Sequence, residues 1–328
     1  MLPSRGVALA AVACALVAAC KSPPAKEPVI TESGSPEEAA KEIKSLLAEA
    51  YQGVRRSNAP GMMSLAAPDI FVAGPRHGDI GIERSAALVT LDDAIRVKKT
   101  HKVKSVKLAV GAAMDGRSAW AVDQIDVDGK GYVVVALAAE LDGLWALTAV
   151  QVARAGGDAE APAAAPPGWK APAAGPNPAH SSAVADAVKV LAQLTGEPDL
   201  RVDYLDHYAD RQSIVVRAGG GKKAALRGVK AIKKAWKKKP PVWTVGAPIA
   251  AASTPDGAFA WVLAPAAMDD EPAGSRRVLM VLEKFEPEVV EMDGDEGGDD
   301  DDDGDDEPPV IQGLPWRLVV LHESAPAP

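Results

Sequence analysis

The sequence predicts an α+β fold that is laid out twice, with helices packed on a curved antiparallel sheet in each half. Three observations predict it. The motif D-G-x-x-A-W occupies residues 115–120 and again residues 256–261. Helical periodicity precedes each copy, and an apolar run and a tryptophan-bearing strand follow each copy. In the first half, Asp-Gly pairs separate the apolar runs, and such pairs favour tight hairpin turns between antiparallel strands.

The N-terminus predicts export and a lipid anchor. Arg5 precedes an apolar run that is too short to span a bilayer and is typical of a secretory signal. Residues 17–20 read Val-Ala-Ala-Cys and resemble a bacterial lipobox, in which cleavage leaves an acylated cysteine. We therefore expect a signal peptide over residues 1–19 and a lipid on Cys20 that contacts the membrane. Cys14 is the alternative lipid site, and an ordinary signal peptide with a chance cysteine is the alternative interpretation.

The next segment predicts a tether and a location in the outer membrane. Residues 20–34 are rich in Pro, Ser and charge without an apolar period, which is typical of a linker. Lys21 stands where the inner-membrane retention signal of enteric bacteria has Asp, which favours the outer membrane of the cell envelope. The chain has only two cysteines, Cys14 and Cys20, so no disulfide is expected in the mature monomer.

Residues 35–154 predict the first α+β domain. The segment 35–38, Ser-Pro-Glu-Glu, is a capping box with proline at the first helical position. Apolar residues then recur at steps of three and four, which predicts a long amphipathic helix that ends near Asn58. A short strand over 70–72 and a further helix over 82–96 are expected to follow.

Strands are expected to dominate the rest of this half. Between residues 103 and 152, Asp-Gly pairs at Asp115, Asp128 and Asp142 separate four apolar segments. Both residues of such a pair tolerate positive φ, as two-residue hairpin turns require. The segments therefore predict a four-stranded antiparallel meander, with the long helix packed on one face.

The second half is separated from the first by a linker and contains an insertion. Residues 155–179 are dominated by Ala, Pro and Gly, which predicts an interdomain linker. A second α+β domain over 180–324 repeats the order of helices and strands. Its closing strand is displaced by an insertion over 286–309, where twelve acidic residues lie between Glu291 and Glu307. We expect this insertion to be disordered and to leave the fold intact, because it falls in a loop between the last two strands.

Charge and motif patterns exclude several classes of function. The formal net charge of −9 is concentrated in the acidic insertion, and the lysine-rich segment 229–239 is typical of a solvated helix face, so we expect no nucleic-acid partner. Residues 219–223 do not complete a phosphate-binding loop. Val310 stands where a calcium-binding loop would need its closing Glu. The sequence has neither zinc-type cysteine or histidine spacing nor a serine-histidine-aspartate arrangement, so we expect no metal and no cofactor.

The layout of each half resembles the nuclear transport factor 2-like superfamily, especially its SnoaL-like members. The closing strand of that family often reads W-R, an apolar run and then H-x-S, and residues 316–324, WRLVVLHES, fit closely. The first half keeps Trp145 but has Gln151 where His322 stands. The resemblance covers most of the mature chain and implies a cone-shaped α+β barrel in each half. Because the family commonly dimerises through its sheets, it also implies that the two halves pair as an intramolecular pseudo-dimer.

The resemblance places any ligand in a pocket between the sheet and the long helices. Asp123, Asp126 and His322 are the candidate catalytic groups, because enzymes of the family use a buried carboxylate or histidine as a base. Asp123 and Asp126 are separated by an odd number of residues, so they face opposite sides of a strand and do not form a simple pair. If the closing strand alternates regularly, His322 shares a face with Trp316. A hydrogen-bonded histidine that lines the barrel is favoured there over a ligand contact.

A small hydrophobic ligand is the expected partner of such a pocket, besides the membrane. The candidate ligand-binding residues are Trp120, Gln151, Trp261, Trp316 and His322. The sequence thus predicts an exported, lipid-anchored envelope protein that acts as a small-molecule-binding or protein-interaction module. The alternatives are an enzyme of the isomerase, cyclase or dehydratase type on a small hydrophobic substrate, and a structural spacer of the envelope. The absence of an acid from the strand of the second half that corresponds to Asp123 favours binding over catalysis.

Overall fold

The structure is a computed structural model that describes residues 34–95, 97–155, 181–196, 200–217, 225–238, 243–268, 271–285 and 314–325. The expected signal peptide, Cys20, nearly all of the tether and of the interdomain linker, and the acidic insertion lie outside these residues. Among the residues that are described, no helix is both long enough and apolar enough to cross a membrane.

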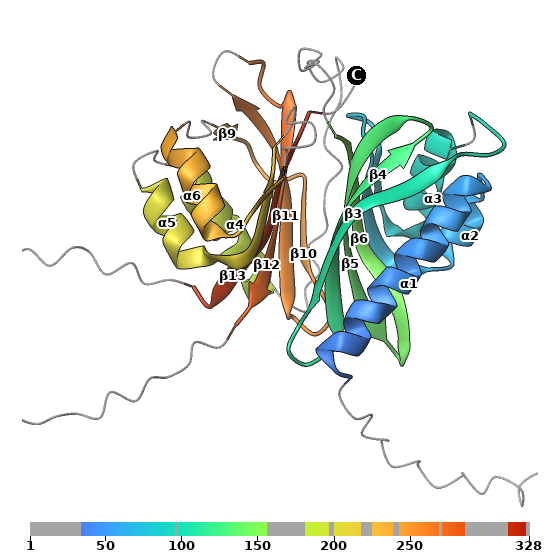
Figure 1. The fold of residues 1–328 in the computed structure, drawn as a ribbon, viewed down its shortest axis with the longest axis horizontal. Helices are drawn as coiled ribbons and strands as arrows, with labels where there is room; N and C mark the ends of the chain where they lie inside the picture. Colours follow the sequence, from blue (N-terminus) through green and yellow to red (C-terminus); the bar gives the residue numbers. More distant parts are fainter. Residues whose placement is uncertain are drawn as a thin grey trace, which may run out of the picture. The chain divides into compact units, whose positions relative to one another are not determined.

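Three helices and a six-stranded sheet form the first half (Figure 1). The elements are α1 (Pro36–Arg55), α2 (Ala59–Met63), β1 (Ala66–Ala73), β2 (Ile80–Ile82), α3 (Glu83–Ile95), β3 (Val103–Ala112), β4 (Ser118–Val127), β5 (Lys130–Leu141) and β6 (Leu144–Arg154). The strand order is β2-β1-β6-β5-β4-β3. Neighbouring strands are antiparallel except β1 and β6, which run parallel because the chain returns to the sheet through the helices and the meander.

The local signals that predict these elements are confirmed. At the start of α1, the Ser35 Oγ accepts a hydrogen bond from the Glu38 backbone N–H, and the Glu38 Oε2 accepts one from the Ser35 N–H. The two-residue turns begin at Asp128 (φ 54°) and Asp142 (φ 51°), each followed by a glycine with positive φ. The turn at Asp115 differs, because only its glycine has positive φ.

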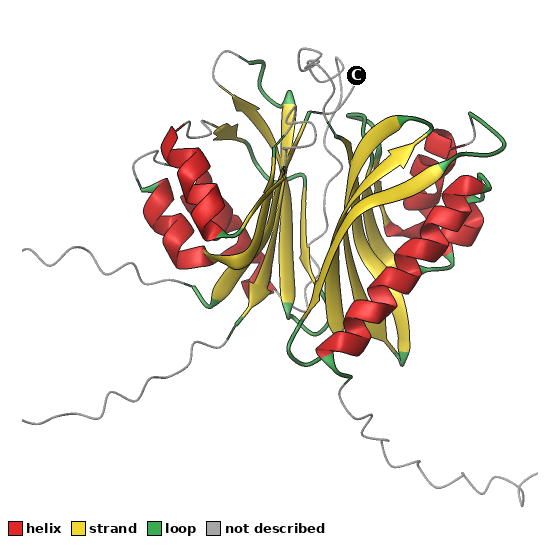
Figure 2. Cartoon of the chain, viewed as in Figure 1, coloured by secondary structure: helices red, strands yellow, loops and turns green. Residues whose placement is uncertain are grey.

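The second half repeats this order. Its elements are α4 (Ser181–Thr195), α5 (Arg201–Tyr208), β7 (Ala209–Val216), β8 (Ala225–Arg227), α6 (Val229–Lys238), β9 (Trp243–Val245), β10 (Ala250–Ser253), β11 (Phe259–Met268), β12 (Arg276–Lys284) and β13 (Trp316–Ser324). The strand order is β10-β11-β12-β13-β7-β8, and β9 pairs with β11. The fold class is therefore α+β, with helices over one face of each sheet (Figure 2).

The buried side chains form three clusters. One lies between the helices and sheet of the first half, and a second lies between the helices and sheet of the second half. The third cluster contains side chains of both sheets, from the faces that their own helices do not cover. In β4, for example, Ala121 faces α1 whereas Trp120 belongs to the third cluster, as the alternation of a strand requires.

A β-bulge in the closing strand changes the face to which His322 belongs. The pairing of β13 with β12 shifts register between Leu318 and Val320, so Val319 is an extra residue. A bulge of this kind interrupts the alternation of faces. Trp316 and Leu318 therefore belong to the helix-side cluster and Val320 to the cluster between the sheets. The expectation that His322 shares a face with Trp316 is wrong for this reason.

Candidate functional site

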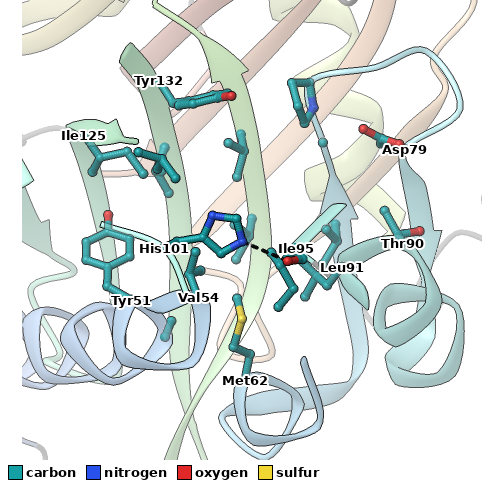
Figure 3. A pocket seen from close by; sticks show the side chains of 18 of the residues that line it. Tyr51, Val54, Met62, Asp79, Thr90, Leu91, Ile95, His101, Ile125 and Tyr132 are labelled. Carbon is teal, nitrogen blue, oxygen red and sulfur yellow. Dashed lines mark hydrogen bonds between the residues drawn. The ribbon is translucent and has the colours of Figure 1, made fainter. Parts of the chain in front are cut away.

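A cavity of about 390 Å³ lies in the first half, between the three helices and the helix-facing side of the sheet (Figure 3). Its walls are mainly aliphatic. They include Val54 of α1, Met62 of α2 and Leu91 and Ile95 of α3, which face Ile125 of the sheet. An apolar cavity of this size is within the usual range of small-molecule sites.

The corresponding position in the second half is occupied by larger side chains. Helix α6 buries Ile232 and Trp236 four residues apart, whereas α3 has Ala87 and Leu91 at the same spacing. The Trp236 ring also meets Trp243 edge to face, with centroids 6.0 Å apart. Leu91 therefore lines the open cavity of the first half at the position where the second half buries the larger ring of Trp236.

Polar groups meet the cavity where α3 ends and the β4–β5 turn begins. His101 Nδ1 lies 2.9 Å from Asp128 Oδ2, and its Nε2 lies 2.8 Å from the carbonyl oxygen of Ile95. Both partners are acceptors, and the ring satisfies both only when each nitrogen carries a proton. Lys98 Nζ also lies 2.9 Å from Asp128 Oδ2. Hydrogen bonds from the Lys102 backbone N–H, Lys98 and His101 hold the pKa of Asp128 well below its usual range.

A second polar group lies at the base of the cavity on α1. Tyr51 lines the cavity, and its hydroxyl donates a 3.0 Å hydrogen bond to Asp123 Oδ2. Ser105 Oγ donates to the other carboxylate oxygen at 2.9 Å. Burial raises the pKa of Asp123, and burial together with the nearby carboxylate raises the pKa of Tyr51. Asp123 is completely buried and, in the described part of the chain, does not itself line the cavity.

The other predicted catalytic residues lie elsewhere. Asp126 accepts a hydrogen bond from the Gly129 N–H and so shapes the β4–β5 turn. It makes no pair with Asp123, as their odd spacing predicts. His322 is buried on the side of β13 that faces away from the helices, where its Nδ1 lies 2.9 Å from Gln151 Oε1 of the first half. It is hydrogen-bonded, as predicted, but it does not line a barrel.

Four of the five predicted ligand-binding residues, Trp120, Gln151, Trp261 and His322, gather between the two sheets and none of the five lines the 390 Å³ cavity. Trp261 packs against Phe71 with ring centroids 4.6 Å apart. Trp316 lies on the helix side of the second half, where its Nε1 donates to Asp186 Oδ2 at 3.0 Å. Ligand contact by these five residues stays a prediction, and their contacts in the structure are with other side chains.

Sequence reasoning missed Tyr51, His101 and Asp128 as site residues. Tyr51 carried one available signal, because it is a polar group on the apolar stripe of α1. Asp128 was assigned only to a turn, and its pairing with His101 across 27 residues leaves no pattern in the sequence. Within the described ranges, no group of three His, Cys, Asp or Glu side chains could hold a metal ion.

Comparisons with known proteins concern the fold. No family model matches the chain, and no curated protein matches its sequence. Among solved structures, the chain is similar to a nuclear transport factor 2-like protein of unknown function from Pseudomonas putida, with 18% identity and a TM-score of 0.34 over 39% of this chain and 92% of that one. It is also similar to a protein of unknown function with a cystatin-like fold from Nostoc punctiforme, with 13% identity and a TM-score of 0.33 over 37% of this chain and 94% of that one.

A third similar structure is a putative dehydratase of the nuclear transport factor 2-like family from Streptomyces avermitilis, with 12% identity and a TM-score of 0.32 over 37% of this chain and 98% of that one. Since one fold carries many activities, the function has to be argued from the cavity itself.

Proposed function

We propose that this chain binds a small, mainly apolar molecule in the cavity of its first half, as a lipid-anchored module of the cell envelope. One observation carries the binding proposal, namely the 390 Å³ cavity with mainly aliphatic walls and a few polar groups at its edge, among them His101, Lys98 and Asp128. Apolar walls supply affinity, and a few fixed polar groups orient the ligand. The anchor is supported by the lipobox-like residues 17–20.

Filling the cavity is expected to abolish binding. Leu91→Trp gives α3 the kind of side chain that α6 has at Trp236, and the added ring occupies the ligand's volume. With N-phenyl-1-naphthylamine, a neutral apolar fluorophore, the wild-type chain is expected to bind one probe with micromolar affinity, as is usual for a small ligand of this size. The variant is expected to bind at least about tenfold more weakly or not at all, because the probe could enter only by overpacking the space beside the added ring, and overpacking a protein interior costs about 1–3 kcal/mol.

Leu144→Trp is the matched control, because it makes the same substitution at a leucine that is 74% exposed and does not line the cavity. Thermal melting of both variants checks that the fold is intact. Failure of the wild-type chain to bind, or equal affinity in Leu91→Trp, contradicts the proposal. Native mass spectrometry of the purified chain complements the test by searching for a co-purified small molecule.

An enzyme on a small hydrophobic substrate is the second candidate function. The observation that favours it is the Tyr51 hydroxyl, which borders the cavity and is hydrogen-bonded to a buried carboxylate whose pKa is raised. Raised carboxylate pKa values of this kind suit proton transfer near neutral pH. The three donors that Asp123 already accepts from, Tyr51, Ser105 and the Lys107 backbone, favour a structural role instead.

Tyr51→Phe separates these two roles. The change removes the donor and leaves the buried Asp123 with one partner fewer, so a structural role predicts a loss of about 1–3 kcal/mol in the free energy of unfolding. Urea denaturation measures this loss, and Tyr132→Phe, a half-buried tyrosine of the same cavity, is the control. Unchanged stability with unchanged probe affinity would instead leave Tyr51 free for chemistry and would favour the enzyme.

We also propose that the two halves associate as an intramolecular pseudo-dimer. The support is the mixed cluster of side chains between the sheets, together with the hydrogen bond of His322 to Gln151. A packed interface of this kind would hold the second half in one position relative to the cavity of the first half.

A further inference from the structure

Arg277 of β12 is a buried cation that contacts the first half of the chain. It is 1% exposed. One of its terminal nitrogens donates to the carbonyl oxygens of Arg76, at 3.0 Å, and of His77, and the other donates to that of Gly74 at 3.4 Å. Burial lowers the pKa of Arg277 to about 10, so the group is charged at neutral pH. Burying a charge is unfavourable unless hydrogen bonds satisfy it, and these three carbonyls bind the two terminal nitrogens, while the buried Nε has no hydrogen-bond partner among the described residues.

All three carbonyls belong to the loop over residues 74–79, which joins β1 to β2. Gly74, Pro75, Arg76 and Asp79 of this loop line the cavity. Within the loop, the Gly74 N–H donates to the Asp79 carbonyl at 2.6 Å, and the Arg76 N–H donates to the Asp79 carboxylate at 3.0 Å. The loop ends in a strand of three residues at the edge of the sheet, and the bonds from Arg277 add contacts from the second half to those within the loop.

The position equivalent to Arg277 in the first half does not carry a cation. Trp261 pairs with Val281 on β12, and Trp120 pairs with Leu137 on β5. Four residues before these partners stand Arg277 and Val133, so the two occupy equivalent positions. Val133 is an apolar residue of the cluster between the sheets. The second half therefore supplies a cation to the cavity loop of the first half, whereas the first half has a valine at the equivalent position.

We propose that Arg277 is a positioning residue for the cavity, and that the second half of the chain serves as the scaffold that sets the conformation of the 74–79 loop. The inference rests on the proposed binding function. The two halves then have different roles. The first half, with Leu91 on α3, binds the ligand. The second half has Trp236 and Trp243 in its core and supplies Arg277 to the loop at the edge of the cavity.

The test is Arg277→Met in the full chain, which keeps the length of the side chain and removes its donors. Hydrogen exchange of the backbone amides over residues 74–80 reports the loop directly. Exchange there is expected to accelerate about tenfold, the factor that corresponds to one lost hydrogen bond to a charged group. The affinity for N-phenyl-1-naphthylamine is expected to fall by about the same factor, since a mobile margin must be ordered on binding.

Arg317→Met is the matched control, because Arg317 lies on the neighbouring strand and pairs with Glu283 and Asp210 of its own half. It is expected to leave loop exchange and probe affinity unchanged. If Arg277→Met does not fold, Arg277→Lys, which keeps the charge but not the forked donors, takes its place.

The two proposals fail in different ways. Unchanged loop exchange and unchanged affinity in the Arg277 variant overturn the positioning role while wild-type binding still supports the cavity as a site. Faster loop exchange in a chain that does not bind the probe supports the positioning of the loop and rejects the binding function. Equal effects of the Arg277 and Arg317 variants also overturn the positioning role, because they indicate general destabilisation.

Discussion

Trp261→Ala is expected to lower the free energy of unfolding by about 3–5 kcal/mol, the range observed for removing a buried aromatic side chain. Trp261 is 4% exposed and packs against Phe71, with ring centroids 4.6 Å apart and planes inclined by 34°. The two rings come from the two different sheets, β11 and β1. The loss therefore includes packing within the second half and packing between the sheets.

A double-mutant cycle separates these two contributions. Urea denaturation, followed by circular dichroism, is measured for Trp261→Ala, Phe71→Ala and the double variant. A coupling energy of about 0.5–1.5 kcal/mol is expected, as for aromatic pairs in contact. Trp145→Ala, at a half-buried tryptophan of the first half that lies outside the cluster between the sheets, is expected to cost less and to show no coupling to Trp261.

Strict additivity of the two changes contradicts the pseudo-dimer. Small-angle scattering then provides a second measurement, because a chain whose halves do not associate has a larger radius of gyration. If the sheets separate in solution, Arg277 also leaves the 74–79 loop, and the scaffold role that we infer for the second half is lost with it.

The sequence predicted where helices and turns occur better than it predicted which face of a strand meets the helices. Residues 35–38 mark the start of α1 through contacts within four residues, and the Asp-Gly pairs at 128 and 142 require positive φ locally. Such signals depend on contacts within a few residues and therefore little on the rest of the fold. By contrast, β4 is buried on both faces over residues 118–123. When both faces of a strand are apolar, alternation does not tell which one meets the helices. Trp120 and Trp261 were therefore placed at a ligand site although they lie between the sheets.

The resemblance places a pocket between the sheet and the helices, but the half in which it is open could not be predicted, because that depends on a sum of side-chain volumes. No single residue marks it. Leu91 lines the cavity in one half, and the larger Trp236 is buried at the equivalent position of the other half. Close packing makes this sum sensitive to each side chain, and the contributing helices are distant in the sequence from the strands that they cover. The bulge at Val319 is similar, since one extra residue in a strand reverses the following face and has no compositional mark.

Acid is expected to destabilise the chain through His322, and His322→Gln is expected to remove this effect. The histidine is 1% exposed, and burial lowers its pKa from 6.5 to about 4. Its Nδ1 faces the Gln151 amide oxygen, which only accepts, so the neutral ring carries its proton on Nδ1. Protonation adds a charge to a ring that is fully buried. The unfolded chain therefore takes up this proton more readily than the folded chain does.

The sign of the pH dependence follows from that difference. Above pH 6.5 both states are neutral at this residue, and the full stability is present. As the pH falls from 6.5 through 4, the unfolded state gains the proton first, and about 3 kcal/mol of the free energy of unfolding is lost. Burial raises the pKa of Asp123, Glu283 and Glu323, and these groups act in the opposite sense, because their protonation on acidification favours the folded state.

The difference between wild type and His322→Gln isolates the histidine from these carboxyl groups. Glutamine can still bond to Gln151, so the variant keeps a polar contact but does not titrate. Urea denaturation at pH 7, 5.5 and 4 is expected to show the unfolding free energy of the wild type falling by about 3 kcal/mol relative to that of His322→Gln on acidification. His207→Gln, at an exposed histidine of α5, is the control and is expected to follow the wild type. Parallel profiles for wild type and His322→Gln would mean that water reaches His322 in solution, and hence that the sheets are not packed around it.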